Sequence, residues 1–311
     1  MRFALTHPLL SAEPDLRLAD PDGLAQVAAA AETAGFSGFG VTDHPAPSRE
    51  WLAAGGHRAL DPFVALTWAA AHTTDIRLIT NLLVLPYRNP FLVASAAATL
   101  DRLSGGRLTL TLGTGYLEAE FAALGVDHAE RNVRFDESLS IMRQCWSGDP
   151  VNASSDALHA SDVVSWPTPV QSGGPRLWIG GNSALARRRS ASTSGWAPFP
   201  AGRGMASATR TAPLTQPGDV GQHLDAIASA RADLGLATEP FDVAFALARH
   251  APPGSPDFDP GSYLDGIGGL SAAGINWCWV HIPGESIEAA CEAIEGFGAE
   301  VITPHSADQQ A

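Results

Sequence analysis

The chain contains no lysine: all 19 of its Lys-plus-Arg positions are arginine. With 33 acidic residues, the formal net charge is −14 at pH 7. Proteins that bind nucleic acid need a basic surface to neutralise phosphates, so nucleic acid is not expected as the main partner. The missing lysine is compatible with a GC-rich coding sequence and says little about function.

Cysteine is scarce, and no metal-binding pattern is present. Cys145, Cys278 and Cys291 are an odd set without CxxC spacing, and each lies in an apolar pattern. This predicts buried free thiols in a reducing compartment rather than disulfides or a metal site. The ten histidines form no HxH or HExxH spacing, which disfavours a catalytic zinc, and no GxSxG occurs.

Long hydrophobic runs are also missing. No stretch of about 18 apolar residues occurs, and the N-terminus MRFALTHPLL has no basic region leading into a long apolar run. Neither a signal peptide nor a transmembrane helix is indicated, so we expect a cytoplasmic protein with no membrane partner.

What the chain does have is enough apolar sequence for a large core. Of its 311 residues, 45% are hydrophobic and 17% are charged, unlike the composition of disordered chains. An α/β barrel of this length is usually one domain, so the order of elements must decide the domain count.

The most informative stretch predicts a strand, a helix and a second strand. Ile76 to Leu85 is almost continuously apolar, as expected of a strand covered on both faces. Asn89-Pro90 is a helix start, and the helix ends after Leu103. Leu108 to Leu112 alternates and runs into Gly113-Thr114-Gly115. Such a unit makes a parallel pair, with ligands at the carboxyl ends of its strands.

The same alternation continues along the chain. Further strands are expected at 2–6, 36–42, 176–179, 195–199, 241–249 and 275–282, and further helices at 18–34, 61–72, 131–146, from 184, 219–235, 263–273 and 286–297. Eight strands, each followed by a helix, predict a (β/α)8 TIM barrel, a single domain over residues 1–311. Residues 147–174 have no lasting period and are expected to be an insertion with room for one hairpin. Residues 200–218 form a loop long enough to be a lid.

Asp43-His44 follows the second strand at the expected barrel mouth. A histidine there exchanges a proton near neutral pH, and an adjacent carboxylate sets its charge. The alternative, a histidine that only hydrogen-bonds its loop, stays open.

Two glycine-rich turns are candidate cofactor contacts. Gly180-Gly181-Asn182-Ser183 presents backbone N–H groups and a hydroxyl at a helix start, which suits a phosphate, or it is a tight turn with an ordinary cap. Gly113-Thr114-Gly115 lets a planar ligand approach the backbone, or it is a plain bend.

The remaining candidates are aromatic or titratable residues near strand ends and in long loops. Trp51, Tyr116 and Trp196 either stack on a bound ring or belong to the core. The carboxylates Glu118 and Glu120 either touch a ligand or only complement a helix dipole. The candidate substrate contacts are His7, Trp51, His57, Glu120, Trp196 and Arg210.

Several segments together resemble one family, the luciferase-like monooxygenase superfamily, and most closely its flavin- and coenzyme F420-dependent oxidoreductases. They are VTDHP (41–45), LLVLPYRNPFLVASAAATLDRLSGGRLTLTLGTGYLEAEFAALGVD (82–127), ERNVRFDESL (130–139), PRLWIGGNS (175–183), GWAPF (195–199) and VHIPG (280–284). The resemblance implies a (β/α)8 barrel with an insertion region, often a homodimer, whose reactive ring lies at the C-terminal mouth.

Carried onto this sequence, the resemblance places Asp43 and His44 beside the deazaflavin, with His44 as proton donor or acceptor. A non-proline cis peptide behind the ring would fall near Asn81-Leu82. Gly113 to Tyr116 would border the ring, and Gly180 to Ser183 would take the phosphate. Val151 to Val164 departs from the family, because it lacks the usual aromatic and glycine strand pair.

Two function classes follow. The first is an F420-dependent oxidoreductase that transfers a hydride between the deazaflavin and a small organic substrate; its variant is an FMN-dependent monooxygenase served by a separate flavin reductase. The second is a barrel that binds flavin without turnover. The Asp43-His44 pair favours an enzyme, because a non-catalytic binder needs no titratable pair at the ring. No metal is expected, and the sequence does not identify the substrate.

Overall fold

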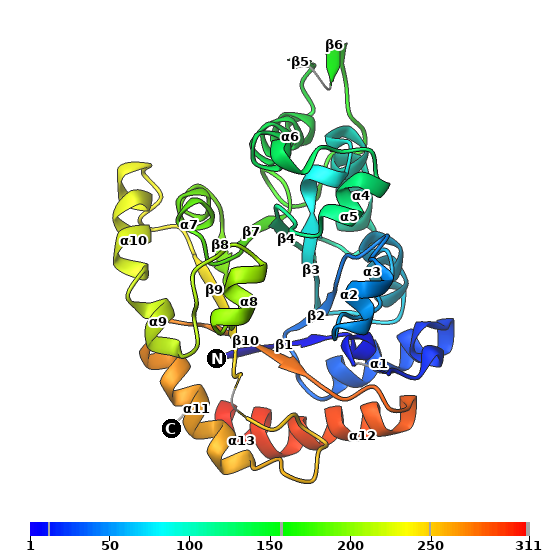
Figure 1. The fold of residues 1–311 in the computed structure, drawn as a ribbon, viewed down its shortest axis with the longest axis vertical. Helices are drawn as coiled ribbons and strands as arrows, with labels where there is room; N and C mark the ends of the chain where they lie inside the picture. The colour runs from blue at the N-terminus through cyan, green and yellow to red at the C-terminus, as the bar shows by residue number, and fades with distance from the viewer. Residues whose placement is uncertain (12, 156–157, 249, 309–311) are drawn as a thin grey trace.

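The computed structural model describes residues 1–11, 13–155, 158–248 and 250–308 (Figure 1). Its parallel strands close into a barrel in the order β1-β10-β9-β8-β7-β4-β3-β2, and helices surround it (Figure 1). The predicted (β/α)8 barrel is confirmed. The barrel strands are β1 (Arg2–Thr6), β2 (Gly38–Val41), β3 (Arg77–Val84), β4 (Leu108–Gly113), β7 (Arg176–Gly180), β8 (Gly195–Ala197), β9 (Asp242–Ala246) and β10 (Trp277–His281).

The helices lie in the connections between strands and after the last strand. They are η1 (Pro8–Leu10), η2 (Leu16–Ala19), α1 (Pro21–Thr33), α2 (Arg49–Ala53), α3 (Pro62–Ala71), η3 (Leu85–Tyr87), α4 (Pro90–Leu103), α5 (Glu118–Ala123), η4 (His128–Glu130), α6 (Arg131–Ser147), α7 (Ala184–Ser190), α8 (Arg203–Ala208), α9 (Pro217–Gly221), α10 (Leu224–Asp233), α11 (Pro260–Ala272), α12 (Ile287–Phe297), η5 (Gly298–Ile302) and α13 (Thr303–Asp308). No helix within these ranges is both long and apolar enough to cross a bilayer.

The long segments at the strand ends contain regular structure, part of which the sequence did not predict. The insertion holds the expected hairpin, β5 (Val151–Ser154) antiparallel to β6 (His159–Val163), which projects from the barrel beyond α6 (Figure 1). The loop after β2 contains α2, which starts where Ser48 Oγ accepts the Trp51 N–H. The lid contains α8. Helices this short have no room for a lasting apolar period, so the sequence did not reveal them.

Tryptophan fills the barrel interior. Trp178, Trp277 and Trp279 are buried there with alanines of neighbouring strands. Bulky rings on some strands require small residues opposite, and Gly195 is one of them, because a Cβ there would overlap the Trp178 ring. The interior is therefore a packed core, and a ligand has room only beyond the strand ends.

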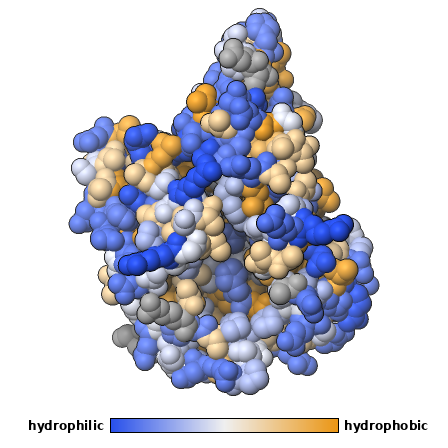
Figure 2. Space-filling model, viewed as in Figure 1, coloured by the Kyte–Doolittle hydropathy of each residue, from blue (hydrophilic) through white to orange (hydrophobic). Residues whose placement is uncertain are grey.

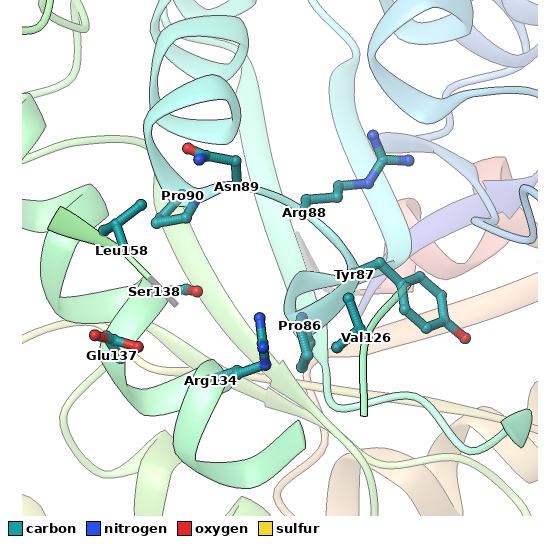
Figure 3. A pocket seen from close by; sticks show the side chains of 10 residues that line it. All are labelled: Pro86, Tyr87, Arg88, Asn89, Pro90, Val126, Arg134, Glu137, Ser138 and Leu158. Carbon is teal, nitrogen blue, oxygen red and sulfur yellow. The ribbon is translucent and has the colours of Figure 1, made fainter. Parts of the chain in front are cut away.

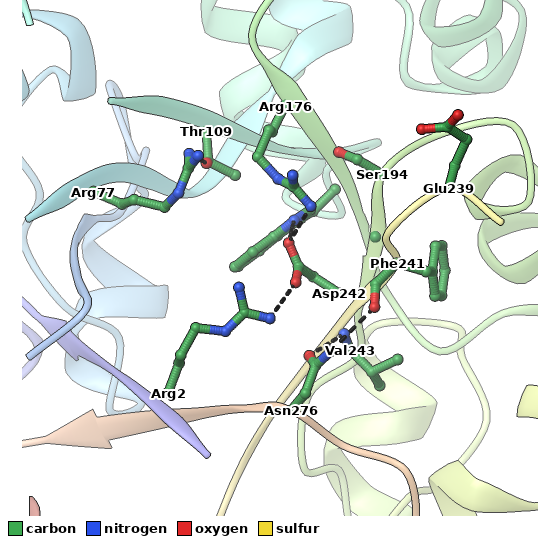
Figure 4. Close-up of polar contacts among 12 residues, drawn as sticks. Arg2, Arg77, Thr109, Arg176, Ser194, Glu239, Phe241, Asp242, Val243 and Asn276 are labelled. Atoms are coloured by element: carbon green, nitrogen blue, oxygen red, sulfur yellow. Dashed lines mark hydrogen bonds and ion pairs between the residues drawn. The ribbon is translucent and has the colours of Figure 1, made fainter. Parts of the chain in front are cut away.

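An ionic layer lies at the N-terminal end of the barrel (Figure 4). Asp242 accepts hydrogen bonds from Arg2 Nη2 at 2.6 Å and Arg176 Nη2 at 2.7 Å. The Trp178 indole also donates to Asp242, at 3.2 Å, and the Arg2 guanidinium lies 4.6 Å from the Trp277 ring centroid. Strong polar contacts at this end of a TIM barrel serve stability. The opposite end carries the candidate site.

Candidate active site

His44 lies among aromatic rings at the C-terminal mouth. Its ring centroid is 4.5 Å from that of Trp51, 4.9 Å from His57 and 6.4 Å from Tyr116. The loop after β2 supplies three of these residues, and Tyr116 follows β4. The surface is hollowed between α2 and α8, two helices of loops at this end of the barrel (Figure 2). The structure therefore brings together four residues that the sequence singled out separately.

Glu120 is the carboxylate that pairs with His44. Its side chain is 0% exposed. Oε2 accepts from the Tyr87 hydroxyl at 2.8 Å and lies 3.2 Å from His44 Nδ1, while Oε1 accepts the Ala46 N–H at 3.3 Å. Burial alone would raise the pKa of Glu120, but hydrogen bonds from His44, Tyr87 and Ala46 lower it overall. Glu120 is thus an ionised carboxylate whose two oxygens are bonded within the protein.

Asp43 has other partners. It is 3% exposed, and its Oδ2 accepts the Val84 N–H at 3.0 Å while Oδ1 accepts from Arg88 Nη2 at 2.8 Å. Neighbouring residues of an extended chain point to opposite sides, so Asp43 faces β3 when His44 faces the mouth. The idea that the adjacent carboxylate sets the charge of His44 is therefore corrected, because Glu120 is the carboxylate bonded to His44.

The end of β3 has an irregular backbone. The Asn81–Leu82 peptide is cis, at the position that the resemblance implies. The pairing of β3 with β4 shifts register between Thr80 and Leu83. The Asn81 side-chain amide donates to Thr6 Oγ1 at 3.1 Å.

The glycines at the ends of β4 and β7 make room for side chains. A Cβ at Gly113 or at Gly180 would overlap the methyl groups of Leu82. Gly115 has a left-handed φ of 71°, and a Cβ there would lie 2.6 Å from Val84 Cγ1. The sequence predicted that a planar ligand could approach the backbone at Gly113. In the structure the Leu82 side chain lies in the space beside this glycine.

The turn from Gly180 to Ser183 is held by contacts within the protein. Asn182 is 0% exposed, and its side chain bonds the backbone of Phe199 and Ala212. Gly181 N–H donates to Ala197 O at 3.2 Å, and Ser183 Oγ caps α7 by accepting the Ala186 N–H. These bonds tie the turn to the lid. Its role in binding phosphate stays a prediction.

Two predicted substrate contacts lie away from the mouth. His7 is 3% exposed, with its ring edge-on to Phe39 at 5.8 Å between centroids. Burial lowers the pKa of His7 to about 4. Trp196 is 0% exposed and donates from Nε1 to Gly181 O. Because side chains alternate along strands, these two face the helix layer instead of the ligand side, which corrects both assignments.

Arg210 and Glu118 connect the lid to α5. Arg210 has a φ of 52°, in the left-handed region, and its Nη2 lies 2.9 Å from Glu118 Oε1. Both side chains are about two-thirds exposed, at 65% and 64%, so this ion pair contributes little to stability. Arg210 therefore borders the site with its charge partly offset.

His281 is a mouth residue that the sequence analysis did not include among its candidates. It ends β10, is exposed, and pairs in register with Thr6. Its pKa is nevertheless lowered by desolvation, as expected for a side chain inside a recess. Desolvation, followed by the charges of His44 and His281, lowers the pKa of His57 to about 4. In the sequence, the position of His281 at the end of the last strand was the signal that could have identified it as a mouth residue.

A separate cavity of about 160 Å³ lies behind the turn that carries Tyr87 and Arg88. Its far wall includes Arg134, Glu137 and Ser138 of α6. Figure 3 shows Tyr87 and Arg88 directed away from these α6 side chains. The turn thus separates this cavity from the hydrogen bonds around Asp43 and Glu120. Across the described ranges, no three His, Cys, Asp or Glu residues gather closely enough to hold a metal ion.

Comparison with known proteins identifies the family. The family model described as luciferase-like monooxygenase matches residues 1–214. The chain belongs to this family. Among curated relatives of this luciferase-like chain, an F420-dependent glucose-6-phosphate dehydrogenase from Gordonia bronchialis is 34% identical over 171 residues, covering 50% of this chain and 48% of the relative.

The curated relatives include monooxygenases as well as F420-dependent dehydrogenases. A 4-hydroxyprotoasukamycin monooxygenase from Streptomyces nodosus subsp. asukaensis is 34% identical over 151 residues, covering 48% of this chain and 41% of the relative. The luciferase-like chain thus spans about half the length of the curated relatives it matches. A solved monooxygenase from Streptomyces bottropensis has a TM-score of 0.80 at 16% identity, covering 98% of this chain and all of that one, and shows a shared fold.

Proposed function

We propose that the protein is an F420-dependent oxidoreductase that moves a hydride between the deazaflavin and a small organic substrate. The observation that carries this proposal is the contact of the buried Glu120 carboxylate with His44, 3.2 Å from Oε2 to Nδ1. It fixes an imidazole at the mouth, where a proton has to be exchanged when a hydride enters or leaves a carbon bearing oxygen or nitrogen.

The residues of the mouth fit a flat, planar cofactor. The rings of His44, Trp51, His57 and Tyr116 gather there, where they can pack against a flat ring. His57 has its pKa lowered to about 4 and is neutral at physiological pH, so it adds no positive charge there. When bound, F420 supplies a two-electron hydride donor or acceptor.

His44 is the proposed acid or base. With Nδ1 hydrogen-bonded to Glu120, its Nε2 is the nitrogen left to exchange a proton with the substrate. Asp43 contributes indirectly, because it anchors the end of β3 and the loop that carries His44. Gly180 to Ser183 and nearby arginines are the proposed contacts of the acidic cofactor tail.

The competing proposal is an FMN-dependent monooxygenase that uses oxygen and a separate flavin reductase. The similarity to the Streptomyces nodosus monooxygenase favours it. A barrel that binds flavin without turnover predicts tight cofactor binding and no reaction.

The test is single-turnover reduction of bound F420 by a panel of small alcohols and amines, alongside oxygen uptake with reduced FMN. Substrate-dependent F420 reduction, with no oxygen uptake, supports the proposal. His44→Gln should retain cofactor binding and lower the rate by about 10² to 10⁴, the usual contribution of a general acid or base. Substrate-dependent oxygen uptake with FMN and no reaction with F420 would overturn it.

We also propose a homodimer that covers the outer faces of α3 and α4, two helices in contact with each other. On these faces Val64 is 71% exposed, Leu92 is 72% exposed and Trp68 is 42% exposed. Apolar side chains gathered on adjacent helices are typical of protein interfaces. Light scattering of the wild type and of Leu92→Glu tests this: the wild type should have twice the monomer mass, and the variant should dissociate.

A further inference from the structure

We infer that Glu120 is a positioning residue that selects the tautomer of His44. It holds the imidazole with its hydrogen on Nδ1 and leaves the lone pair on Nε2. The inference rests on the proposed role of His44, but the tautomer itself is measurable without any substrate.

The environment of Glu120 decides its charge. The carboxylate is fully buried, and an ionised carboxylate in such a place is stable only when its oxygens are hydrogen-bonded. Tyr87 and Ala46 supply two of its donors, and His44 Nδ1 lies close enough to be the third. With its pKa held below the usual value, Glu120 is ionised at neutral pH and has no hydrogen of its own to donate.

The charge of Glu120 decides which nitrogen of His44 carries the hydrogen. An ionised carboxylate only accepts hydrogen bonds, so the nitrogen that faces it must carry the hydrogen. A neutral imidazole in water favours the other tautomer, with the hydrogen on Nε2. Glu120 therefore imposes the less common form, in which Nε2 is ready to take a proton.

Tyr87 supports this arrangement from a third segment. Burial, followed by the hydrogen bond to Glu120, raises the pKa of Tyr87, so its hydroxyl remains a donor. It binds the same Oε2 that His44 faces, which fixes the rotation of the carboxylate. The three residues come from the loop after β2, the turn after β3 and the start of α5, so their alignment depends on the barrel.

The side chains around His44 do not offer a substitute. His57 approaches edge-on, and its own Nδ1 lies 3.2 Å from Arg58 O, which as a carbonyl requires a hydrogen on that nitrogen. Trp51 packs against the His44 ring, and Tyr116 is farther away. Glu120 is the one carboxylate within salt-bridge distance of His44 in the described structure.

The experiment is ¹⁵N NMR of the histidine side chains in the full-length protein at about pH 8.5, well above the ordinary histidine pKa of about 6.5. His44→Gln assigns the His44 signals by their loss. The wild type should show a protonated Nδ1 and an unprotonated Nε2. In Glu120→Gln the amide can donate to Nδ1, so the tautomer should reverse.

Glu118→Gln is the matched control, because Glu118 also lies on α5 but is 64% exposed and bonded to Arg210. It should leave the His44 signals unchanged. If Glu120→Gln does not fold, the double variant Tyr87→Phe, Glu120→Leu removes the carboxylate together with the hydroxyl that it accepts from, and should shift His44 to the Nε2–H tautomer. An Nε2–H tautomer in the wild type, or an unchanged tautomer in a folded Glu120→Gln protein, would overturn the inference.

Kinetics then separate this inference from the proposed function. With a substrate in hand, Glu120→Gln should lower kcat at least about tenfold and leave KM and the cofactor Kd within about twofold. A reversed tautomer combined with full activity in both Glu120→Gln and His44→Gln would leave the tautomer selection intact and remove His44 from the proposed function.

Discussion

Arg88 reaches back from the turn after β3 to Asp43 at the end of β2, with 2.8 Å between Nη2 and Oδ1. The Arg88 side chain is 22% exposed, and that of Asp43 is 2% exposed. Arg88 also contacts Asp61, just before α3, so one guanidinium holds both ends of the loop between β2 and α3. This pair fixes the loop of His44 relative to the bulged end of β3.

Replacing Asp43 by asparagine tests the importance of this pair. Asp43→Asn keeps the size of the side chain but removes the charge that Arg88 faces inside the protein. We expect the free energy of unfolding to fall by about 1–3 kcal/mol, measured by urea denaturation. The control Asp61→Asn removes a carboxylate that is 42% exposed and should cost less than about 1 kcal/mol. Equal losses in the two variants would mean that burial of the pair is unimportant.

Gly113→Ala tests the fit of Leu82 at the mouth. The added methyl overlaps Leu82, so the Leu82 side chain has to shift at the mouth, where the cofactor is proposed to bind. Overpacking typically costs about 1–3 kcal/mol, and each 1.4 kcal/mol lost in binding is about a tenfold weaker Kd. We therefore expect at least about tenfold weaker cofactor binding in a fluorescence titration.

The control for this variant is Gly204→Ala in α8, where a new Cβ meets no atom within 4 Å. Its cofactor affinity should match that of the wild type. Normal affinity in Gly113→Ala would show that Leu82 does not border the bound ring.

His7 predicts a specific sensitivity to acid. Its pKa is lowered by burial from 6.5 to about 4. Between pH 6.5 and about 4, His7 is protonated in the unfolded chain but neutral in the folded protein. The free energy of unfolding therefore falls as the pH falls through this window. Integrated over the window the loss is about 3 kcal/mol. His7→Leu removes the buried imidazole, together with its hydrogen bond to the Leu18 backbone, and should remove this loss.

Urea denaturation at several pH values between 7 and 4 measures the effect. His7→Leu should lose less stability across the window than the wild type does. His159→Gln, which changes an exposed histidine, is the control and should follow the wild-type curve. If the His7→Leu curve also follows the wild type, the buried imidazole is not the source of acid sensitivity.

The sequence predicted the barrel because local signals agreed with the fold. Asn89 Oδ1 accepts the Phe91 N–H and Asp61 Oδ1 accepts the Phe63 N–H, as their positions before proline indicated. β3 was predicted from its almost continuous apolar run, as expected of a strand covered on both faces, and β4 from the alternation of leucine and threonine before Gly113.

The candidate site was harder to predict, because its contacts are distant in sequence or depend on which face a residue occupies. Glu120 lies 76 residues from His44, and no local pattern links them. β8 has only three residues, too few to reveal the face of Trp196. The sequence places His281 at the end of a strand, but only the closed barrel brings it close enough to His57 to affect the pKa of His57.

The choice between F420 and FMN tests the account most directly. Each cofactor is titrated into the protein while quenching of tryptophan fluorescence is followed, with Trp51 beside His44 as a reporter. The account predicts a lower Kd for F420 than for FMN, and an F420 Kd that rises with salt and on replacement of Arg210 or Arg187 by alanine, since the cofactor tail is acidic. An FMN Kd equal to or lower than that of F420 would contradict the account and favour the FMN-dependent monooxygenase.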